Sequence, residues 1–456
     1  MPSELQVDAA RITSFVDAVE AAGMDLHSLM ILRHGRVVAE GWWAPYRSDD
    51  IQLVYSLSKT FLAMAVGIAI SEGRFSAEDL IADLLPGFAP GPRPDHLRQL
   101  RVRHLLSMAS GHREETLLRI AGTGRDPVAS FLALAPGEPP GSVFAYNQGN
   151  PLTLSQLITS VTGERLVDYL RPRLFDPLGI DRAEWLTVSS GIDQGFSGLH
   201  VTTESVAKLG QLILQLGRWQ DTQLVPAEFV AECRRPQVGN SRTSANPDWQ
   251  QGYGYQMWMC RHGAQRGDGA FGQLMIVLPD ADAVVVCTAQ VLDMQAEVDL
   301  IWQHLLPAFR DLPVSPAADQ HLAGRLARLS VPLVAAGAAG PGEPVELTPT
   351  SAEGGLSGRI DSVRIEPRPG GTRLIITVRG DRHSFDVPDG QWADGVLPGL
   401  HTPFPEVSVS AGWSGAGEYR AEIVSRRTPH RLQLRARPGP PAELSVSWPV
   451  SPPLRF

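Results

Sequence analysis

The sequence is poor in cysteine, has no long hydrophobic run and contains no block of basic residues. Its three cysteines, Cys233, Cys260 and Cys287, are too few and too scattered for a disulfide framework or a zinc knuckle. The longest apolar stretch, residues 61–70, is much shorter than the roughly 20 residues that cross a bilayer. The net charge is -9 over 456 residues, so the sequence indicates no positively charged surface that would bind nucleic acid or an anionic membrane. We therefore expect a cytoplasmic protein without nucleic-acid or membrane partners.

The composition predicts a folded chain with more than one domain. Hydrophobic residues make up 43% and charged residues 20%, which differs from the composition of disordered chains. A chain of 456 residues exceeds what one core usually holds, so we expect a large and a small domain. Residues 1–23 mix acids with apolar residues at helical spacing and have no basic segment followed by an apolar one, so we interpret them as an amphipathic helix and not as a signal peptide.

The first three hundred residues combine strands at both ends with helices between them. Apolar runs at 28–33 and 36–40 flank His34-Gly35, which predicts a hairpin. Strands at both ends and helices between favour an α+β fold in which the N- and C-terminal strands share one antiparallel sheet. Further helices are predicted at 56–70, 154–161, 166–174, 205–216 and 294–306, and strands at 253–259, 274–278 and 283–288.

The composition and the hydrophobic pattern of the sequence change after Pro313. An alanine-rich piece and the run AAGAAGPGEP, within residues 314–344, predict a short helix and a linker. From Val345 onward, short alternating runs separated by Gly and Pro are typical of a small β-barrel or sandwich. The predicted domains are therefore 1–313 and 345–456.

The chemistry-bearing motif of the first domain is Ser56-Leu57-Ser58-Lys59. A serine and a lysine three residues apart lie on one face of a helix, where the amine can take the hydroxyl proton. The spacing alone has little specificity, because Ser205 and Lys208 share it. We interpret the second copy, Ser205 and Lys208, as a match without a catalytic role inside a predicted helix. We interpret Ser58 as a packing or capping residue.

Two further elements follow the serine in order, namely Tyr146-Asn147-Gln148 and Gly267-Asp268-Gly269-Ala270. With these three elements, residues 26–308 resemble the serine β-lactamase and DD-peptidase superfamily, particularly its esterase and aminohexanoate-oligomer hydrolase branch. The segments that carry this resemblance are HSLMILRHGRVVAEGWW, VRHLLSMASGH, LRPRLFDPLGI, GQLILQLGRW and GYGYQMW. The resemblance implies a β-lactamase-like antiparallel sheet flanked by helices, with an all-α insertion.

The resemblance also implies roles for individual residues. Ser56 would attack a carbonyl carbon, and Lys59 and Tyr146 would move its proton to the leaving group, with the order of these two bases left open. Tyr146 can take part as a base only if Lys59 lowers its pKa from near 10. The backbone N–H groups of Ser56 and Phe271 would form the oxyanion hole.

The chain departs from the superfamily's pattern at two positions. Gln148 stands where asparagine or serine is usual; its amide could orient a substrate or simply face solvent. Asp268-Gly269-Ala270 stands where a cation usually begins the motif. An aspartate at a substrate-binding position would repel a substrate carboxylate, which predicts weak β-lactam turnover and a neutral or cationic substrate. The alternative is that Arg266 pairs with Asp268.

Other mechanisms find no support in the sequence. It contains no Gly-x-Ser-x-Gly pentapeptide and no His-Glu-x-x-His motif, and we expect no cofactor or metal. The remaining hypotheses are a hydrolase of small esters or amides, a biosynthetic acyltransferase, and a non-catalytic binding protein; a homodimer is compatible with each.

Some further residues belong to no motif. The histidines among them stay outside the predicted site; they are His112, His200 and His262. The aromatic residues could line an acyl pocket or belong to the core; they are Trp42, Trp43, Tyr253, Tyr255 and Trp258.

Overall fold

The chain forms two compact units. The first unit comprises Met1–Gly41 and Leu53–Ala327, and the second comprises Trp42–Gln52 together with the chain from Arg328 onward. The predicted linker falls partly on residues 336, 338 and 339, which lie outside the described residues. The computed structural model describes residues 1–88, 94–310, 314–335, 337, 340–352, 359–399, 404–415 and 417–452.

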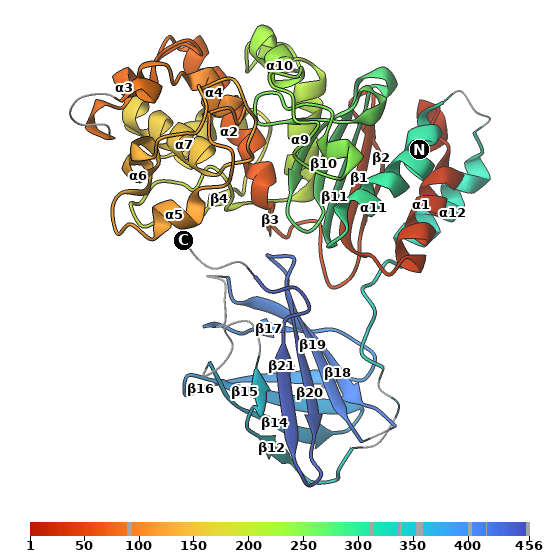
Figure 1. The fold of residues 1–456 in the computed structure, drawn as a ribbon. Helices are drawn as coiled ribbons and strands as arrows, with labels where there is room; N and C mark the ends of the chain where they lie inside the picture. The colour runs from red at the N-terminus through yellow and green to blue at the C-terminus, as the bar shows by residue number, and fades with distance from the viewer. Residues whose placement is uncertain are drawn as a thin grey trace. The chain divides into compact units, whose positions relative to one another are not determined.

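A sheet built from both ends of the first unit forms its centre (Figure 1). The N-terminal strand β1 pairs antiparallel with β11, which is the last strand of this sheet in chain order, as predicted. The turn between β1 and β2 is made by His34 and Gly35, both with positive φ, which confirms the predicted hairpin. In order across the sheet the strands are β2 (Arg36–Trp42), β1 (Asp25–Arg33), β11 (Ala283–Gln290), β10 (Gln273–Leu278), β9 (Gln265–Gly269) and β8 (Trp258–Met259).

Helices cover both faces of this sheet, as Figure 1 shows. Every residue of β11 is buried, which is the pattern of a strand packed on two sides. Helix α9 lies close against one face, because a Cβ on Gly210 would come within 2.6 Å of the Val284 side chain. The flanking helices are α1 (Ala9–Ala21), α9 (Thr203–Leu214), α10 (Ala227–Cys233), α11 (Met294–Leu300) and α12 (Pro316–Leu326).

A helical subdomain is inserted between β2 and α9, in agreement with the expected all-α insertion. Its central helix α2 (Ser58–Ser71) is buried along almost its whole length, as its apolar sequence predicts. Three short strands form a small sheet in the order β3 (Gln52–Leu53), β5 (Leu199–Val201), β4 (Glu184–Trp185). The remaining helices are α3 (Ile81–Leu84), α4 (Val102–Leu106), α5 (Leu117–Ala121), α6 (Pro127–Ala133), α7 (Gly149–Thr162) and α8 (Leu166–Leu170).

One predicted strand is wrong over most of its length. Of the run 253–259, only Trp258–Met259 forms a strand, β8. Gly252 and Gln256 both have positive φ, at 104° and 54°, so the backbone before β8 cannot stay extended. Tyr253 and Trp258 pack in one cluster with Phe144, whereas Tyr255 packs against Phe229.

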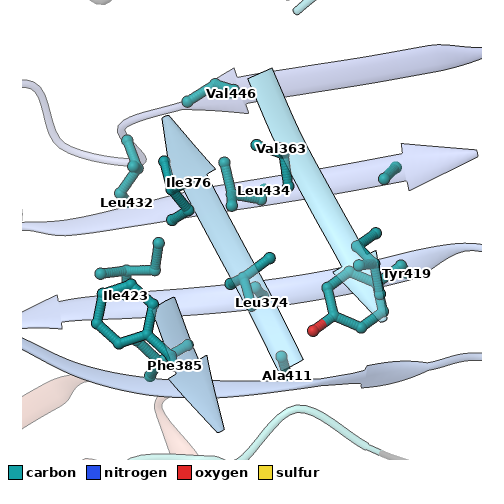
Figure 2. Packing of buried hydrophobic residues seen from close by; sticks show 14 of the residues in the cluster. Val363, Leu374, Ile376, Phe385, Ala411, Tyr419, Ile423, Leu432, Leu434 and Val446 are labelled. Atoms are coloured by element: carbon teal, nitrogen blue, oxygen red, sulfur yellow. The ribbon is translucent and has the colours of Figure 1, made fainter. Parts of the chain in front are cut away.

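The second unit is a two-sheet β-domain, as predicted. Side chains from both sheets point into one hydrophobic core, shown in Figure 2, which is the packing of a sandwich. Each of the six runs after Val345 that were expected to form strands (VRIE, LIITV, HSFDV, YRAEIV, RLQLRA and LSVSW) forms one, whereas four further strands among the described residues were not predicted. One sheet has the order β12 (Val345–Leu347), β14 (Ile360–Arg368), β15 (Gly371–Val378), β16 (Asp381–Pro388); the other has β13 (Ser351–Ala352), β21 (Glu443–Ser447), β20 (Arg431–Arg437), β19 (Tyr419–Ser425), β18 (Glu406–Trp413), β17 (Ala393–Val396).

A core substitution tests the packing of this β-domain. Leu374 has 0% of its surface exposed, so Leu374→Ala should lower the free energy of unfolding of the domain by about 2–5 kcal/mol. Denaturant unfolding followed by tryptophan fluorescence measures this change, because Trp413 and Trp448 lie in the same core. The matched variant Leu333→Ala, at a leucine that is 38% exposed, should change it by less than about 1 kcal/mol. Equal effects of the two variants would contradict the described core.

Candidate active site

Ser56 lies in a short turn, Tyr55–Leu57, that runs directly into helix α2. The Ser58 hydroxyl donates to the Tyr55 carbonyl at 2.5 Å and accepts from the Leu199 N–H at 3.1 Å. Tyr55 has a φ of 47°, a left-handed conformation that costs free energy and persists only where neighbouring contacts hold it. Ser58 therefore anchors the turn, as its predicted capping role implies, and Ser56 faces a pocket.

The Lys59 amine is buried directly beside the serine hydroxyl. Its Nζ donates to Ser56 Oγ at 2.8 Å and to the Phe196 carbonyl at 2.6 Å, and the residue is 1% exposed. Burial lowers the pKa of Lys59 to about 7, although the carboxylates of Glu115 and Asp268 act in the opposite direction. A substantial share of the amine is therefore neutral at neutral pH and can accept a proton.

Tyr146 completes the group around the serine. Its hydroxyl forms a hydrogen bond with Ser56, and Lys59 Nζ lies 4.8 Å from the centre of its ring. Its ring stacks on Trp258 at a centroid distance of 5.2 Å. Burial raises the pKa of Tyr146 and the charge on Asp268 raises it further, while the hydrogen bond with Ser56 opposes them. The condition for Tyr146 to act as a base, a pKa lowered by Lys59, is therefore not met, because desolvation of the phenolate dominates and Tyr146 stays a neutral phenol.

Strand β9 passes the nucleophile turn with glycines at its closest points. A Cβ on Gly269 would lie 2.1 Å from the Val54 carbonyl oxygen and 3.0 Å from Tyr55 Cβ. A Cβ on Gly267 would lie 2.7 Å from the Thr60 hydroxyl. Only glycine allows this approach. Residues 267–272 also happen to match a Gly-x-Gly-x-x-Gly spacing, but they join two antiparallel strands and open no helix, so they form no dinucleotide site.

Asp268 is not a free anion, because Arg266 pairs with it. The two side chains lie on the same face of β9, and Arg266 donates to Asp268 Oδ2 from Nε at 3.2 Å and from Nη2 at 3.0 Å. Trp258 Nε1 donates to Oδ1 at 2.8 Å. Arg266 is 0% and Asp268 7% exposed. The alternative that Arg266 pairs with Asp268 is therefore confirmed, and the expected repulsion of a substrate carboxylate loses its basis, since the pair has no net charge.

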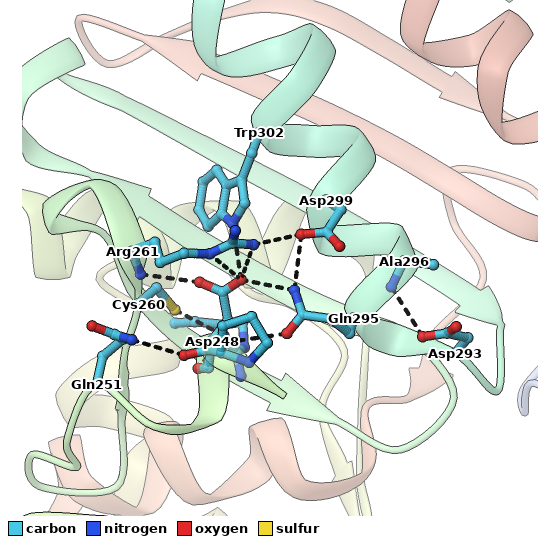
Figure 3. A network of polar contacts seen from close by, with 11 residues as sticks. Asp248, Gln251, Cys260, Arg261, Asp293, Gln295, Ala296, Asp299 and Trp302 are labelled. Carbon is cyan, nitrogen blue, oxygen red and sulfur yellow. Dashed lines mark hydrogen bonds and ion pairs between the residues drawn. The ribbon is translucent and has the colours of Figure 1, made fainter. Parts of the chain in front are cut away.

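A buried polar network is centred on Asp248 (Figure 3), and it helps to hold Arg266 in place. The Asp248 carbonyl accepts from Arg266 Nη1 at 3.2 Å, and the Arg266 guanidinium lies 4.1 Å from the ring centre of Trp249. The carboxylate of Asp248 accepts from Arg261 and Trp302, among others. Burial alone would raise the pKa of Asp248, but hydrogen bonds outweigh it and lower the pKa to about 2. The network thus fixes one wall of the site with charges paired throughout.

These elements surround a pocket of about 600 Å³ at Ser56. Tyr146, Asp268, Gly269 and Ala270 line it, as expected for reacting and substrate-binding positions. The other lining residues give it an apolar wall and a polar mouth; they are Phe144, Ala145, Trp249, Trp258 and Met294, and Arg113, Glu114, Arg242, Thr243 and Ser244.

Two predicted substrate-contacting groups are not among the residues that line this pocket. Gln148 precedes helix α7; its backbone N–H donates to Glu115, and its Oε1 is buried without a hydrogen-bond partner. Phe271 lies in the turn between β9 and β10 with a φ of 69°, and its ring packs edge-on against Tyr55 at 5.3 Å. Ala270, one residue earlier, lines the pocket instead.

Several residues outside the predicted site have structural roles. Ser205 bonds to Thr202 at the start of α9, and Lys208 pairs with Glu204, so the second Ser-x-x-Lys copy brings no amine to its serine. None of the three histidines lines the pocket. His112 bonds to Ser110, His200 to the Gly198 carbonyl, and the ring of His262 packs on Trp302. Of the five aromatic residues considered, Trp258 lines the pocket, while Tyr253 and Tyr255 are buried beside it or against Phe229.

Sequence reasoning missed Glu115, Trp249 and Arg242. Glu115 accepts from the backbone N–H of Thr116, Leu117 and Gln148 and acts on Lys59 through its charge. It follows VRHLLSMASGH, a segment that the resemblance had already marked. No motif marked Trp249 or Arg242, which come from an irregular segment between α10 and β8.

This fold, in which a serine, a lysine and a tyrosine lie together at one pocket, is that of the serine β-lactamase-like superfamily. Residues 12–307, more than half of the chain, match the family model described as Beta-lactamase, and the chain belongs to this family. Over 301 residues it is 27% identical to the 6-aminohexanoate-dimer hydrolase of Paenarthrobacter ureafaciens, covering 61% of this chain and 75% of that protein. The superfamily includes esterases, amidases and acyltransferases.

Two solved structures share the fold at lower identity. EstCE1, described as a hydrolase with promiscuous acyltransferase activity, is similar over 64% of this chain and 98% of its own, with a TM-score of 0.52 and 19% identity. The octameric penicillin-binding protein homologue from Pyrococcus abyssi is similar over 93% of this chain and 99% of its own, with a TM-score of 0.52 and 15% identity. In the described residues, no helix is long and apolar enough to cross a membrane, and no cluster of three His, Cys, Asp or Glu is placed to hold a metal ion.

The close approach of β9 to the nucleophile predicts the effect of one added methyl group. Gly269→Ala should slow ester hydrolysis about 10- to 100-fold, because Val54 and Tyr55 must move and displace Ser56 with them. Initial rates on a p-nitrophenyl ester measure this change, with circular dichroism to check the fold. Gly137→Ala is the matched control, since a Cβ there meets nothing within 4 Å. Unchanged rates for Gly269→Ala would contradict the described packing.

Proposed function

We propose that the protein hydrolyses a small ester or amide through an acyl-enzyme on Ser56. The observation that carries the proposal is the buried amine of Lys59, 2.8 Å from the Ser56 hydroxyl. An amine whose pKa is lowered to about 7 can remove a proton from an alcohol at neutral pH, which an ordinary lysine cannot do. The pocket beside Ser56 provides room for an acyl group against its aromatic wall.

In the first step, neutral Lys59 accepts the proton of Ser56 as Oγ attacks the substrate carbonyl carbon. The oxygen of that carbonyl becomes an oxyanion, which backbone N–H groups stabilise. One donor is the N–H of Ser56. Phe271 was predicted to supply the second donor, but we favour the N–H of Ala270, because Ala270 lines the pocket with Ser56 and Phe271 does not.

In the second step, the leaving group departs with a proton. Tyr146 is a neutral phenol hydrogen-bonded to Ser56, so it can donate its proton to the leaving oxygen or nitrogen and recover one from protonated Lys59. This order makes Lys59 the base and Tyr146 the proton donor. Water then attacks the acyl-enzyme and releases the acid. If an amine reaches the acyl-enzyme before water, the same intermediate leads to acyl transfer.

Replacing the nucleophile tests the proposal directly. Ser56→Ala should lower kcat for p-nitrophenyl ester hydrolysis by at least about 1,000-fold and abolish any initial burst of p-nitrophenol. Ser205→Ala, in the second Ser-x-x-Lys copy, is the matched control and should retain both. Hydrolysis that survives in Ser56→Ala but not in Ser205→Ala would contradict the proposal and would indicate that the reaction takes place at Ser205 and Lys208. Absence of hydrolysis and of covalent labelling in every form would favour a non-catalytic binding protein.

The lowered pKa of Lys59 predicts the pH dependence of the reaction. Only the neutral amine accepts a proton, so kcat/KM should fall about tenfold per pH unit below a midpoint near 7 and level off above it. Rates are measured with an ester whose leaving group absorbs equally in both ionisation states. In Tyr146→Phe the midpoint should stay in place while kcat falls, because the phenol does not titrate in this range. A wild-type midpoint near 10 would contradict the role given to burial.

A further inference from the structure

The charges that line the catalytic pocket are paired, with one exception among the described residues. Asp268 pairs with Arg266 behind the wall. Arg113 forms an ion pair with Glu138, and Glu114 lies 3.5 Å from Arg119. Each of these lining side chains therefore has its opposite charge within the protein, and none of them gives the pocket a net sign.

Arg242 is the exception. It is exposed, it lines the pocket with Thr243 and Ser244, and it forms no hydrogen bond or ion pair with any residue that the structure describes. The segment that carries it is anchored: Thr243 Oγ1 donates to the Asn240 carbonyl at 2.8 Å, and Asn240 Oδ1 accepts from the Gly252 N–H at 2.7 Å. A positive charge is thus presented at the pocket by a held segment.

The pocket that holds this charge and the nucleophile also has an apolar lining. Phe144, Trp249, Trp258 and Met294 line the same pocket as Ser56 and Arg242. Trp258 is fixed by Tyr146, Tyr253 and its hydrogen bond to Asp268. A ligand that satisfies all these surfaces has a carbonyl at one end, an apolar body and an anionic group at the other end.

We propose that Arg242 binds a carboxylate on the substrate, remote from the carbonyl that Ser56 attacks. The proposal rests on the proposed acyl-enzyme function and names its substrate class, an ester or amide that also carries a carboxylate. A guanidinium and a carboxylate form charge-assisted, often bidentate hydrogen bonds. Asp268 of β9 is neutralised by Arg266 and does not set the charge of the substrate. Arg242, in the segment before β8, is the residue that selects a negatively charged substrate.

The test uses two pairs of esters that differ only in charge. Mono-p-nitrophenyl adipate is compared with its methyl ester, which places the carboxylate on the acyl side. 3-Acetoxybenzoate is compared with methyl 3-acetoxybenzoate, which places it on the leaving-group side. In the wild-type protein at low ionic strength, kcat/KM for the acid should exceed that for its methyl ester about five- to tenfold in at least one pair. The preference should shrink as salt is added, because Arg242 is exposed.

The variant Arg242→Gln should lose this preference, so that the ratio of kcat/KM for the acid to that for its methyl ester falls to about one, whereas Arg242→Lys should keep part of the preference. Arg235→Gln is the matched control for a lost positive charge; Arg235 pairs with Glu232 and does not line the pocket. Methyl esters hydrolysed as well as both acids by the wild type, or a preference that survives in Arg242→Gln, would overturn the proposal. Ser56→Ala separates the two claims, since it tests hydrolysis of all four esters and not their ranking.

Discussion

A lysine amine removed from water beside a serine hydroxyl is the interaction on which the site depends. Burial makes the charged form of Lys59 costly, and its contacts with Ser56 and the Phe196 carbonyl give the amine fixed partners. The two carboxylates that act on it favour its charged form. Because Asp268 is bound by Arg266 and Glu115 by backbone N–H groups, part of their effect is absorbed locally. The pairing of Asp268 therefore helps to keep the pKa of Lys59 low, so that part of the amine is neutral at neutral pH.

The fold brings this chemistry together from distant parts of the chain. Helix α2 supplies the amine of Lys59, and the segment before α7 supplies the phenol of Tyr146. Strand β9 can pass close to the serine because it has glycine at 267 and 269. The network around Asp248 connects α11 with the segment before β8 (Figure 3). The Asp248 carbonyl and the ring of Trp249 contact Arg266 at the wall. The groups at which bonds would be made are thus buried and hydrogen-bonded, whereas Arg242 is exposed at the pocket.

Much of this arrangement could be predicted from sequence, and the failures have physical reasons. Helical spacing placed Ser56 and Lys59 on one face, and alternation along β9 allowed the pairing of Arg266 with Asp268 without deciding it. That pairing depends on burial, which a sequence pattern does not show. Strand propensity failed at 253–257, where positive φ at Gly252 and Gln256 turns the backbone. Sequence reasoning provided only the condition under which Tyr146 could act as a base, and the raised pKa depends on burial, which a sequence pattern does not show. The role of Arg242 depends on the course of an irregular segment, which no motif encodes.

A crystal structure of the protein after reaction with a covalent alkyl phosphonate tests the central claim most directly. The account predicts a bond between phosphorus and Ser56 Oγ, with Lys59 Nζ and the Tyr146 hydroxyl both within hydrogen-bond distance of the modified group. A phosphonate attached to another residue, or a modified Ser56 whose neighbouring amine points away toward solvent, would contradict it.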